Sequence, residues 1–451
     1  WSSIELAFEA APPGKSLTNP FDLGAEEQFN AWYWGIAVIV LFYGMLSWQG
    51  TSGYNASATT PHEAKMANIL SGWRFRVLML VTLVLPICIR AAQVDPQFAG
   101  IAEGIAAVTS TQATGAMQAE VRAPAAAALM LPSGLLGLFA AALLGAFIST
   151  NDTYLHSWGS IFIQDVVLPF RKKQLSARAH LWLLRLSILG VAIFAFIFSM
   201  VYTPTQYVAM FLALTGAIFI GGAGSAIIGG LYWSRGTTAG AWSAMISGML
   251  ISCGGIAAKQ LPDDVVTGDG AVFDLVRWAR EGVTGQELTF WSIAIAICCY
   301  VLVSLATCRK RFDMDRMLHR GVYALEGDTI TTHLDLSRRA VMLERLGFDC
   351  EMTRRDRWVT AVTLAWPLIF TILFFTALIA HAAGWSPGAS FWASAWFWYT
   401  AVALTAAACI VTWFTIGGLS DLKSMFAKLN TYHATDTDDG RVIDHHNADE
   451  K

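Results

Sequence analysis

Long apolar runs recur along this chain, and each reaches the roughly 20 residues that a helix needs to cross the hydrocarbon core of a bilayer. The polar segments between them show no alternation of strands and amphipathic helices of the kind expected in a soluble protein of this length. The runs are also too long for the strands of a membrane β-barrel. The pattern predicts an all-α, polytopic helical membrane protein. Its nine predicted spans cover residues 30 to 50, 73 to 93, 133 to 165, 180 to 203, 205 to 233, 237 to 257, 288 to 307, 358 to 382 and 390 to 415.

The polar segments divide the chain further. One large connector covers residues 258 to 287, and a second covers residues 308 to 357. Within the second, DLSRRAVMLERLGF at 335 to 348 is typical of an amphipathic helix. The tail at 416 to 451 becomes acidic and poor in apolar residues from Asp436 onward, which predicts disorder there.

Basic residues predict the orientation, because Lys- and Arg-rich loops stay cytoplasmic. The clusters that begin at Arg171, Arg309 and Arg354 fall on one side of the membrane, and the acidic connector at 258 to 287 falls on the other. We therefore expect an integral protein of the plasma (inner) membrane, with the C-terminus cytoplasmic and residues 1 to 29 outside. Residues 1 to 29 carry no export signal and begin with Trp1, so we expect further spans before them.

Composition narrows the chemistry. Hydrophobic residues make up 55% of the chain and charged residues 14%, and the net charge of −3 predicts no nucleic-acid partner. The seven cysteines show no C-x-x-C spacing, so packing is favoured over disulfides or a metal site. The stretch GGAGSAIIGG at 221 to 230 repeats small residues every four positions, which predicts close helix packing rather than a phosphate loop. No nucleophile triad can be assembled, so we expect no enzyme.

The third apolar run contains an unusual polar stretch, GAFISTNDTYLHSWG, at 145 to 159. At about 100° per residue, Ala146, Ser149, Thr150 and Thr153 share one face of a helix. Two hydroxyls beside a backbone carbonyl offer hard oxygen ligands for an alkali cation, or hydrogen bonds for a substrate. Alternatively, each hydroxyl donates to the carbonyl three or four residues earlier in its own helix.

Asp152 and His156 stack one turn apart on another face of the same helix. An ionised carboxylate at the bilayer centre costs about 2.5 to 3.5 kcal/mol on insertion scales, so Asp152 should point into the helix bundle or water. The pair could form an interhelical latch, carry a proton or make only a local contact.

A second unusual feature follows the first apolar run. Gly44, Gly50 and Gly53 interrupt the semi-apolar stretch at 43 to 65. Non-helical backbone at membrane depth is tolerated where it lines protein or a water-filled cavity, so this stretch could be a broken helix at a binding site. Alternatively, the helix ends at Gln49 and turns into a loop.

Three stretches resemble the sodium:solute symporter family. LPSGLLGLFAAALLGAFISTNDTYLHSWGSIFIQDV at 131 to 166 is similar to the family helix that carries Ser-Ser or Ser-Thr before Asp-Ser. GGLYWSRGTTAGAWSAMISG at 229 to 248 resembles a join between two family helices. WQGTSGYNASATTPHEAKMA at 48 to 67 resembles the family's broken helix, with Gly53-Tyr54 where Gln-Arg is usual.

This resemblance implies a transporter core of two inverted repeats, five helices plus five. Residues 30 to 233 would be the second repeat, and residues 234 to 307 and 358 to 415 would supply four additional C-terminal helices. The first repeat would lie in a missing N-terminal half of the same transporter. The resemblance also implies a sodium site formed by the Ala146 carbonyl and the Ser149 and Thr150 hydroxyls.

For the solute, the resemblance places the central contact region of the broken helix at Leu41 to Gly44. Sugar-handling relatives carry Asn, Lys and Gln where this chain has Leu41, Phe75 and Ala213, so we do not expect a hexose. An aromatic outer gate would fall near Tyr43 or Gly44. Gln49, Phe75 and Arg76 are further pocket or gate candidates. Ordinary helix packing is the alternative for each of them.

The resemblance predicts a secondary active symporter that imports a small organic solute across the lipid bilayer, with Na+ as the coupling ion. Proton coupling through Asp152 or His156 is a variant of the same function. A transporter-like sensor and a non-transporting membrane scaffold are the alternatives from other classes.

Overall fold

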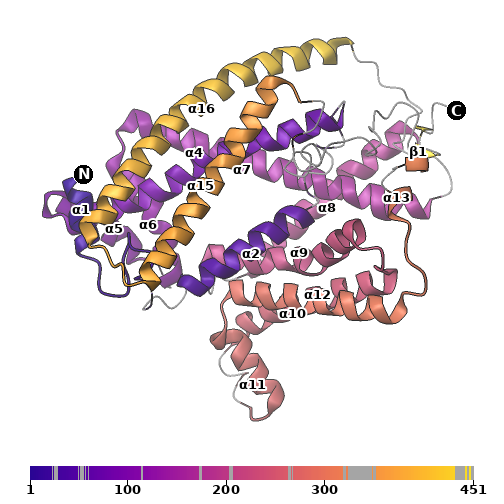
Figure 1. Ribbon diagram of the computed structural model, residues 1–451, viewed down its shortest axis with the longest axis horizontal. Coiled ribbons are helices and arrows are strands. Elements are labelled where there is room, and N and C mark those ends of the chain that lie inside the picture. Colours follow the sequence, from indigo (N-terminus) through magenta and orange to yellow (C-terminus); the bar gives the residue numbers. More distant parts are fainter. Residues whose placement is uncertain are drawn as a thin grey trace. The chain divides into compact units, whose positions relative to one another are not determined.

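The structure is a computed structural model, and it describes most of the chain. The described residues are 1–22, 24, 29–48, 50, 55, 57–58, 60–112, 115–171, 175–202, 207–262, 266, 268–317, 321–323, 348, 352–431, 442–443 and 446–447. Within them, eight helices are long and apolar enough to cross a membrane, which confirms a polytopic helical membrane protein (Figure 1). These are α4 (Pro61–Val94), α7 (Ser133–Ile161), α8 (Ala177–Val201), α9 (Val208–Tyr232), α10 (Thr238–Gln260), α12 (Gly285–Thr307), α15 (Arg354–Ala382) and α16 (Ala389–Thr431).

The first predicted span forms a shorter apolar helix, α2 (Ala31–Ser47), of 17 residues. Asn30 caps its start by accepting a hydrogen bond from the Tyr33 amide at 3.0 Å. The helix ends at Ser47, because Trp48 is already extended. Residues 49, 51 to 54, 56 and 59 lie outside the described residues, and α4 begins at Pro61, so the broken helix and the loop both stay open as interpretations of the stretch at 43 to 65.

Helix ends differ from the predicted spans where polar residues continue the helix. α4 begins at Pro61 rather than at 73, and α16 continues to Thr431 rather than ending at 415. Three short helices that the apolar pattern did not predict lie between α4 and α7. They are η1 (Pro96–Phe98), α5 (Ala99–Thr109) and α6 (Gly115–Met130). Ile89, Ile105 and Ala126 form a buried cluster that holds α4, α5 and α6 together.

The remaining elements are short. They are α1 (Ser2–Glu9), η2 (Phe162–Val167), η3 (Leu168–Phe170), α11 (Ala271–Arg277), η5 (Trp278–Gly282), α13 (Met314–Met317), η6 (Gly321–Tyr323), β1 (Val442–Ile443) and β2 (His446–Asn447). β1 and β2 pair antiparallel. The amphipathic helix predicted at 335 to 348 lies outside the described residues except for position 348, and so does most of the predicted disordered tail.

The chain divides into two compact units. The first contains Trp1–Gln49, Leu85–Ala126 and Pro204–Phe397, and the second contains Gly50–Val84, Ala127–Thr203 and Trp398–Lys451. Residues 30 to 233, predicted as one core repeat, contribute to both units.

The best-packed part of the first unit is formed by α9, α10 and α12, which lie side by side (Figure 1). A Cβ atom added to Gly222 of α9 would lie 2.5 Å from the Ala244 carbonyl oxygen and from the Met245 Cα atom of α10. One added to Gly248 would lie 2.6 Å from the Gly222 nitrogen. The two helix backbones therefore touch, which confirms the close packing predicted from the small residues at 221 to 230.

A buried hydroxyl pair joins α10 to α12 in the same group. Ser252 donates to the Ser292 Oγ atom at 3.1 Å, and Ser292 donates to the Gly248 carbonyl at 3.0 Å. Both side chains are fully buried. Each polar atom therefore has a partner away from lipid, as a polar group inside a membrane protein requires.

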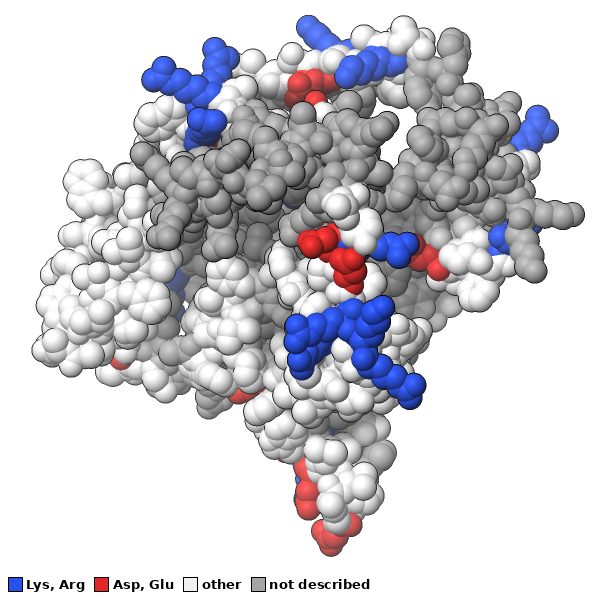
Figure 2. All heavy atoms as spheres, turned by 45° about the vertical axis from the view of Figure 1, so that its right-hand side comes forward, with Lys and Arg blue, Asp and Glu red and all other residues white. Residues whose placement is uncertain are grey.

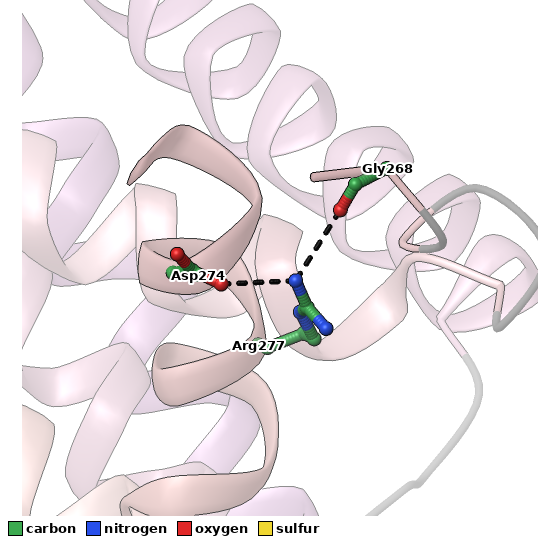
Figure 3. A network of polar contacts seen from close by, with 3 residues as sticks. All are labelled: Gly268, Asp274 and Arg277. Atoms are coloured by element: carbon green, nitrogen blue, oxygen red, sulfur yellow. Dashed lines mark hydrogen bonds and ion pairs between the residues drawn. The ribbon is translucent and has the colours of Figure 1, made fainter. Parts of the chain in front are cut away.

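The connector between α10 and α12 carries α11 and η5. Arg277 donates to the Asp274 carboxylate at 2.9 Å and to the Gly268 carbonyl at 3.3 Å (Figure 3). Lys259, at the end of α10, donates to the Val283 carbonyl at 2.8 Å and to the Arg280 carbonyl at 3.2 Å. These contacts fix the connector to the end of the α10 and α12 pair.

Charge is distributed unequally between the two ends of this pair. Acidic side chains stand at the lower tip in Figure 2, where the connector with α11 lies in Figure 1, and a group of basic side chains occupies the middle of the view. In sequence, Asp269, Asp274 and Glu281 belong to the connector together with Arg277 and Arg280. At the other end of α12, Arg309, Lys310 and Arg311 follow, with Asp313 and Asp315 after them.

Candidate functional site

The polar stretch predicted to bind sodium lies in the middle of α7, a continuous helix in the second unit. Ala146, Ser149 and Thr150 follow one another within two turns, and all three are exposed. Among the described residues, neither the Ser149 nor the Thr150 hydroxyl takes part in a hydrogen bond, whereas the neighbouring Asn151 amide donates back to the Phe147 carbonyl at 2.9 Å. Both hydroxyls are therefore available to an external ligand.

Several hydroxyls on other membrane helices of this chain behave differently. Ser199 of α8 donates to the Phe196 carbonyl at 2.7 Å, and Thr405 of α16 donates to the Ala401 carbonyl at 2.9 Å. Thr371 of α15 donates to the Pro367 carbonyl at 2.7 Å. Bonding back within the helix is a common arrangement for such residues. Ser149 and Thr150 lack it, as do Thr376 of α15 and Ser394 and Thr400 of α16 among the described residues.

The sodium-site face of α7 continues one turn further than predicted. Ala146, Thr150, Thr153 and Ser157 are spaced by four, three and four residues, which places them on one face. Ser157 donates to the Gly50 carbonyl at 3.2 Å. This face therefore contacts the segment that follows Trp48. The same spacing, extended by four residues from Thr153, would have identified Ser157 from the sequence.

The opposite side of α7 packs against α8. Gly159 is buried, and a Cβ atom added there would lie 2.9 Å from the Ile188 Cγ1 atom. Ser187 of α8 donates to the Gly159 carbonyl at 3.4 Å. At about 100° per residue, Gly159 points nearly opposite to Ala146 and Thr150. Packing on α8 therefore leaves the sodium-site face uncovered by that helix.

After Ile161, where α7 ends, the chain continues into the wider π-helical turn η2. Ile163 in this turn is fully buried and clusters with Leu168 and Leu175. π-helical turns recur at functional sites, and here the wider turn anchors the end of α7.

Asp152 and His156 are both exposed on α7. Among the described residues, they form no ion pair with each other or with another helix. The interhelical latch and the proton carrier both remain predictions.

The predicted gate residues Tyr43 and Gly44 lie on the side of α2 that packs against α9, inside the first unit. The Tyr43 hydroxyl donates to the Gly221 carbonyl at 3.0 Å and lies 2.9 Å from the Ser225 Oγ atom. The absence of a side chain at Gly224 makes room for the Tyr43 ring, because an added Cβ atom would lie 2.5 Å from the Tyr43 Cε1 atom. Tyr43 therefore packs as a hydrogen-bonded contact between α2 and α9 in this structure.

The residues of α2 and α9 near Tyr43 differ in burial. Ser47, fully buried, donates to the Tyr43 carbonyl at 2.8 Å. A Cβ atom added to Gly44 would lie 3.9 Å from the Ile220 Cδ1 atom, an ordinary packing distance. Leu41 is 60% exposed, and Ala213 is half-buried on α9. The structure thus brings Tyr43 and Gly44 to the α9 surface and leaves Leu41 outside that contact.

Phe75 and Arg76 lie on α4 in the second unit. Phe75 is 47% exposed, with the Arg74 guanidinium 5.2 Å from its ring centroid. The Arg76 guanidinium lies over the Trp73 ring at 4.3 Å. A cation over an aromatic face is a favourable local contact. Both pairs are therefore held within α4.

These features define an integral membrane protein of the polytopic helical class, with uncommitted hydroxyls on one helix and a tightly packed three-helix group. Residues 37–248 match the sodium:solute symporter family, which confirms the resemblance over the segment from within α2 to within α10. Members of that family are membrane transporters rather than enzymes. A search of curated proteins found no match to the chain.

Proposed function

We propose that this chain acts in a secondary active transporter that couples sodium entry to the import of a small organic solute. Two findings support the proposal. The family match covers the helix with the Ser149-Thr150 pair, and members of this family typically couple transport to sodium. The observation that carries it is that the family match includes this helix, whose Ser149 and Thr150 hydroxyls are exposed and make no hydrogen bond with the described residues.

In the proposed sodium site, the ion is held by the Ala146 carbonyl and the Ser149 and Thr150 hydroxyls. Neutral oxygen donors of this kind suit a hard monovalent cation, and the remaining ligands would come from outside this face of α7. Because α8 covers the opposite side, an ion bound here would tie α7 to whatever supplies those ligands. Sodium would then favour the conformation in which the two are close, which is coupling by differential binding.

The proposed solute region is the Leu41 to Gly44 end of α2. Leu41 and Ala213, both in the first unit, offer no hydrogen-bonding side chains of the kind that sugar-handling relatives carry, so the solute would be recognised there by apolar contacts and backbone groups. A gating role for Tyr43 would require its ring to leave the α9 surface, which means breaking its contacts with Gly221 and Ser225.

The charge asymmetry supports the predicted orientation. The basic residues after α12 would face the cytoplasm, and the acidic connector with α11 would face outward, as basic loops stay inside.

The test is solute uptake by the intact transporter in proteoliposomes, with an inward sodium gradient and with choline in place of sodium. We expect Thr150→Val and Ser149→Ala to raise the sodium concentration for half-maximal uptake by tenfold or more. Each lost hydroxyl removes an ion–dipole contact with the cation, which we take as comparable to the about 1.5 to 3 kcal/mol of a hydrogen bond to a charged group. Thr405→Val is the matched control, because its hydroxyl is bonded within α16. Unchanged sodium dependence in both site variants would remove the sodium site.

The same assay separates the alternatives. Uptake that continues in choline and follows a proton gradient would assign coupling to the proton, with Asp152 and His156 as the next residues to substitute. No uptake of any solute with or without sodium would favour the sensor or the scaffold.

A further inference from the structure

The last turns of α16 extend well beyond a membrane span. α16 has 43 residues, which corresponds to about 64 Å at ~1.5 Å per residue. The hydrocarbon core of a bilayer measures about 30 Å and needs roughly 20 residues of helix. The apolar run of α16 ends at Ile416, and one uninterrupted helix continues to Thr431 (Figure 1). Residues 419 to 431 are therefore a helical extension outside the hydrocarbon core, here called the α16 extension.

The α16 extension is amphipathic. At about 100° per residue, its apolar side chains fall within an arc of roughly 120°. They are Leu419, Leu422, Met425, Phe426 and Leu429. Each is between 46% and 59% exposed, so the described part of the chain does not cover this apolar face. The rest of the circumference carries the polar residues Ser420, Asp421, Lys423, Ser424, Lys428 and Asn430.

Lys423 lies next to the edge of the apolar face formed by Leu419 and Phe426. Lys428 lies about 60° beyond the other edge, formed by Met425, with Asp421 between the two. Together with Asp421 they give the extension a small positive charge. Lysines in these positions can lay their carbon chains along apolar surface and hold the ammonium groups in water or among lipid phosphates.

A pair of glycines separates the span from the extension. A Cβ atom added to Gly417 or to Gly418 would meet nothing within 4 Å, so close packing does not account for either glycine. Each glycine inside a helix costs about 0.5 to 1 kcal/mol relative to alanine. Glycine pairs are also positions at which helices bend. α16 runs through this pair as one continuous helix, and the pair is the position at which the extension could bend away from the span, here called the joint.

We propose that the α16 extension is an interfacial helix that binds anionic lipid. Its apolar face would lie at the boundary of headgroups and acyl chains, with Lys423 and Lys428 on lipid phosphates and the joint at Gly417 and Gly418 setting the angle to the span. A lipid occupant is favoured over a protein partner because the extension is continuous with a membrane span and leaves the bilayer at its surface. The amphipathic pattern with flanking lysines is that of helices that lie in the membrane plane. The proposal does not depend on the transported ion or solute.

The test uses spin labels on the intact protein in nanodiscs, after replacement of the seven native cysteines. Labels at Leu422→Cys and Phe426→Cys report on the apolar face, and labels at Ser420→Cys and Ala427→Cys report on the polar face. We expect the first pair to be severalfold more accessible to oxygen than to a water-soluble nickel complex, and the second pair to show the reverse. Phosphatidylglycerol in a phosphatidylcholine bilayer should strengthen the contrast, and the pair Lys423→Gln and Lys428→Gln should abolish this strengthening.

Two results would overturn the proposal. Equal exposure of all four labels to the nickel complex would place the extension in water. Protection of positions 422 and 426 that is the same in detergent micelles and in both bilayers would show that protein, from this chain or another, covers the apolar face.

Discussion

The Tyr43 hydroxyl lies 2.9 Å from the Ser225 Oγ atom, and this contact joins residues that are 182 positions apart in the chain. The same hydroxyl donates to the Gly221 carbonyl, so one side chain of α2 satisfies two polar groups of α9. In a membrane protein, such a contact stabilises a helix pair where the hydrophobic effect contributes nothing to helix association.

Tyr43→Phe should destabilise the α2 and α9 pair by about 1 kcal/mol, because it leaves Ser225, which is buried, without this partner. The measurement is the thermal unfolding temperature of the purified protein in one detergent. Tyr232→Phe is the matched control, since Tyr232 is in the same unit, at the end of α9, and 76% exposed. Equal shifts in both variants would mean that the hydroxyl contact contributes nothing specific.

Gly222→Ala should be more damaging. Its added Cβ atom would meet the α10 backbone at 2.5 Å, and backbone atoms cannot move aside as a side chain can. Overpacking of this kind costs about 1 to 3 kcal/mol, and we expect lower yield of folded protein and a lower unfolding temperature.

The control for this prediction is Gly230→Ala on the same helix. A Cβ atom at Gly230 would meet nothing within 4 Å, and alanine is the better helix former. It should therefore be neutral or slightly stabilising. If both alanine variants behave alike, the backbone contact between α9 and α10 is not as close as described.

Lys259→Met should loosen the connector between α10 and α12. The Lys259 ammonium donates to two carbonyls of the connector, and its removal takes both hydrogen bonds away. We expect faster proteolysis between residues 261 and 284 while the rest of the chain stays protected. Arg277→Met is the comparison, because its pair with Asp274 is exposed and such pairs contribute about 0 to 1 kcal/mol. Similar cleavage rates in the two variants would argue against the Lys259 clamp.

The membrane class and the approximate spans could be predicted because apolar run length alone decides them. Helix ends could not, since polar residues at 61 to 72 and 416 to 431 continue a helix outside the hydrocarbon run. Close packing of Gly222 was likewise evident from its spacing, but its partner in α10 was not. A local pattern shows which helix face carries small residues, but it does not show which distant segment packs against that face.

The candidate site divides in the same way. Ser149 and Thr150 stood out because polar residues are costly inside a span. Whether their hydroxyls bond within their own helix could not be predicted, since the sequence is compatible with either arrangement. The burial of Tyr43 depends on Gly224 and Ser225, which are far away in the sequence, so its resemblance to a gate residue could not reveal the packing contact.

Ser157 gives a last prediction, which rests on the proposed sodium coupling. Its hydroxyl holds the Gly50 carbonyl from the same face of α7 as Ala146 and Thr150, so it positions that face without being a proposed sodium ligand. Ser157→Ala should raise the sodium concentration for half-maximal uptake by about fivefold, which corresponds to a hydrogen bond of ~1 kcal/mol, and leave the maximal rate nearly unchanged. Ser157→Thr, which keeps the hydroxyl, should restore the original value, and Ser199→Ala should have no effect because its hydroxyl bonds within α8. A loss of maximal rate with unaltered sodium dependence would instead assign Ser157 to the movement of α7 and separate the Gly50 contact from ion binding.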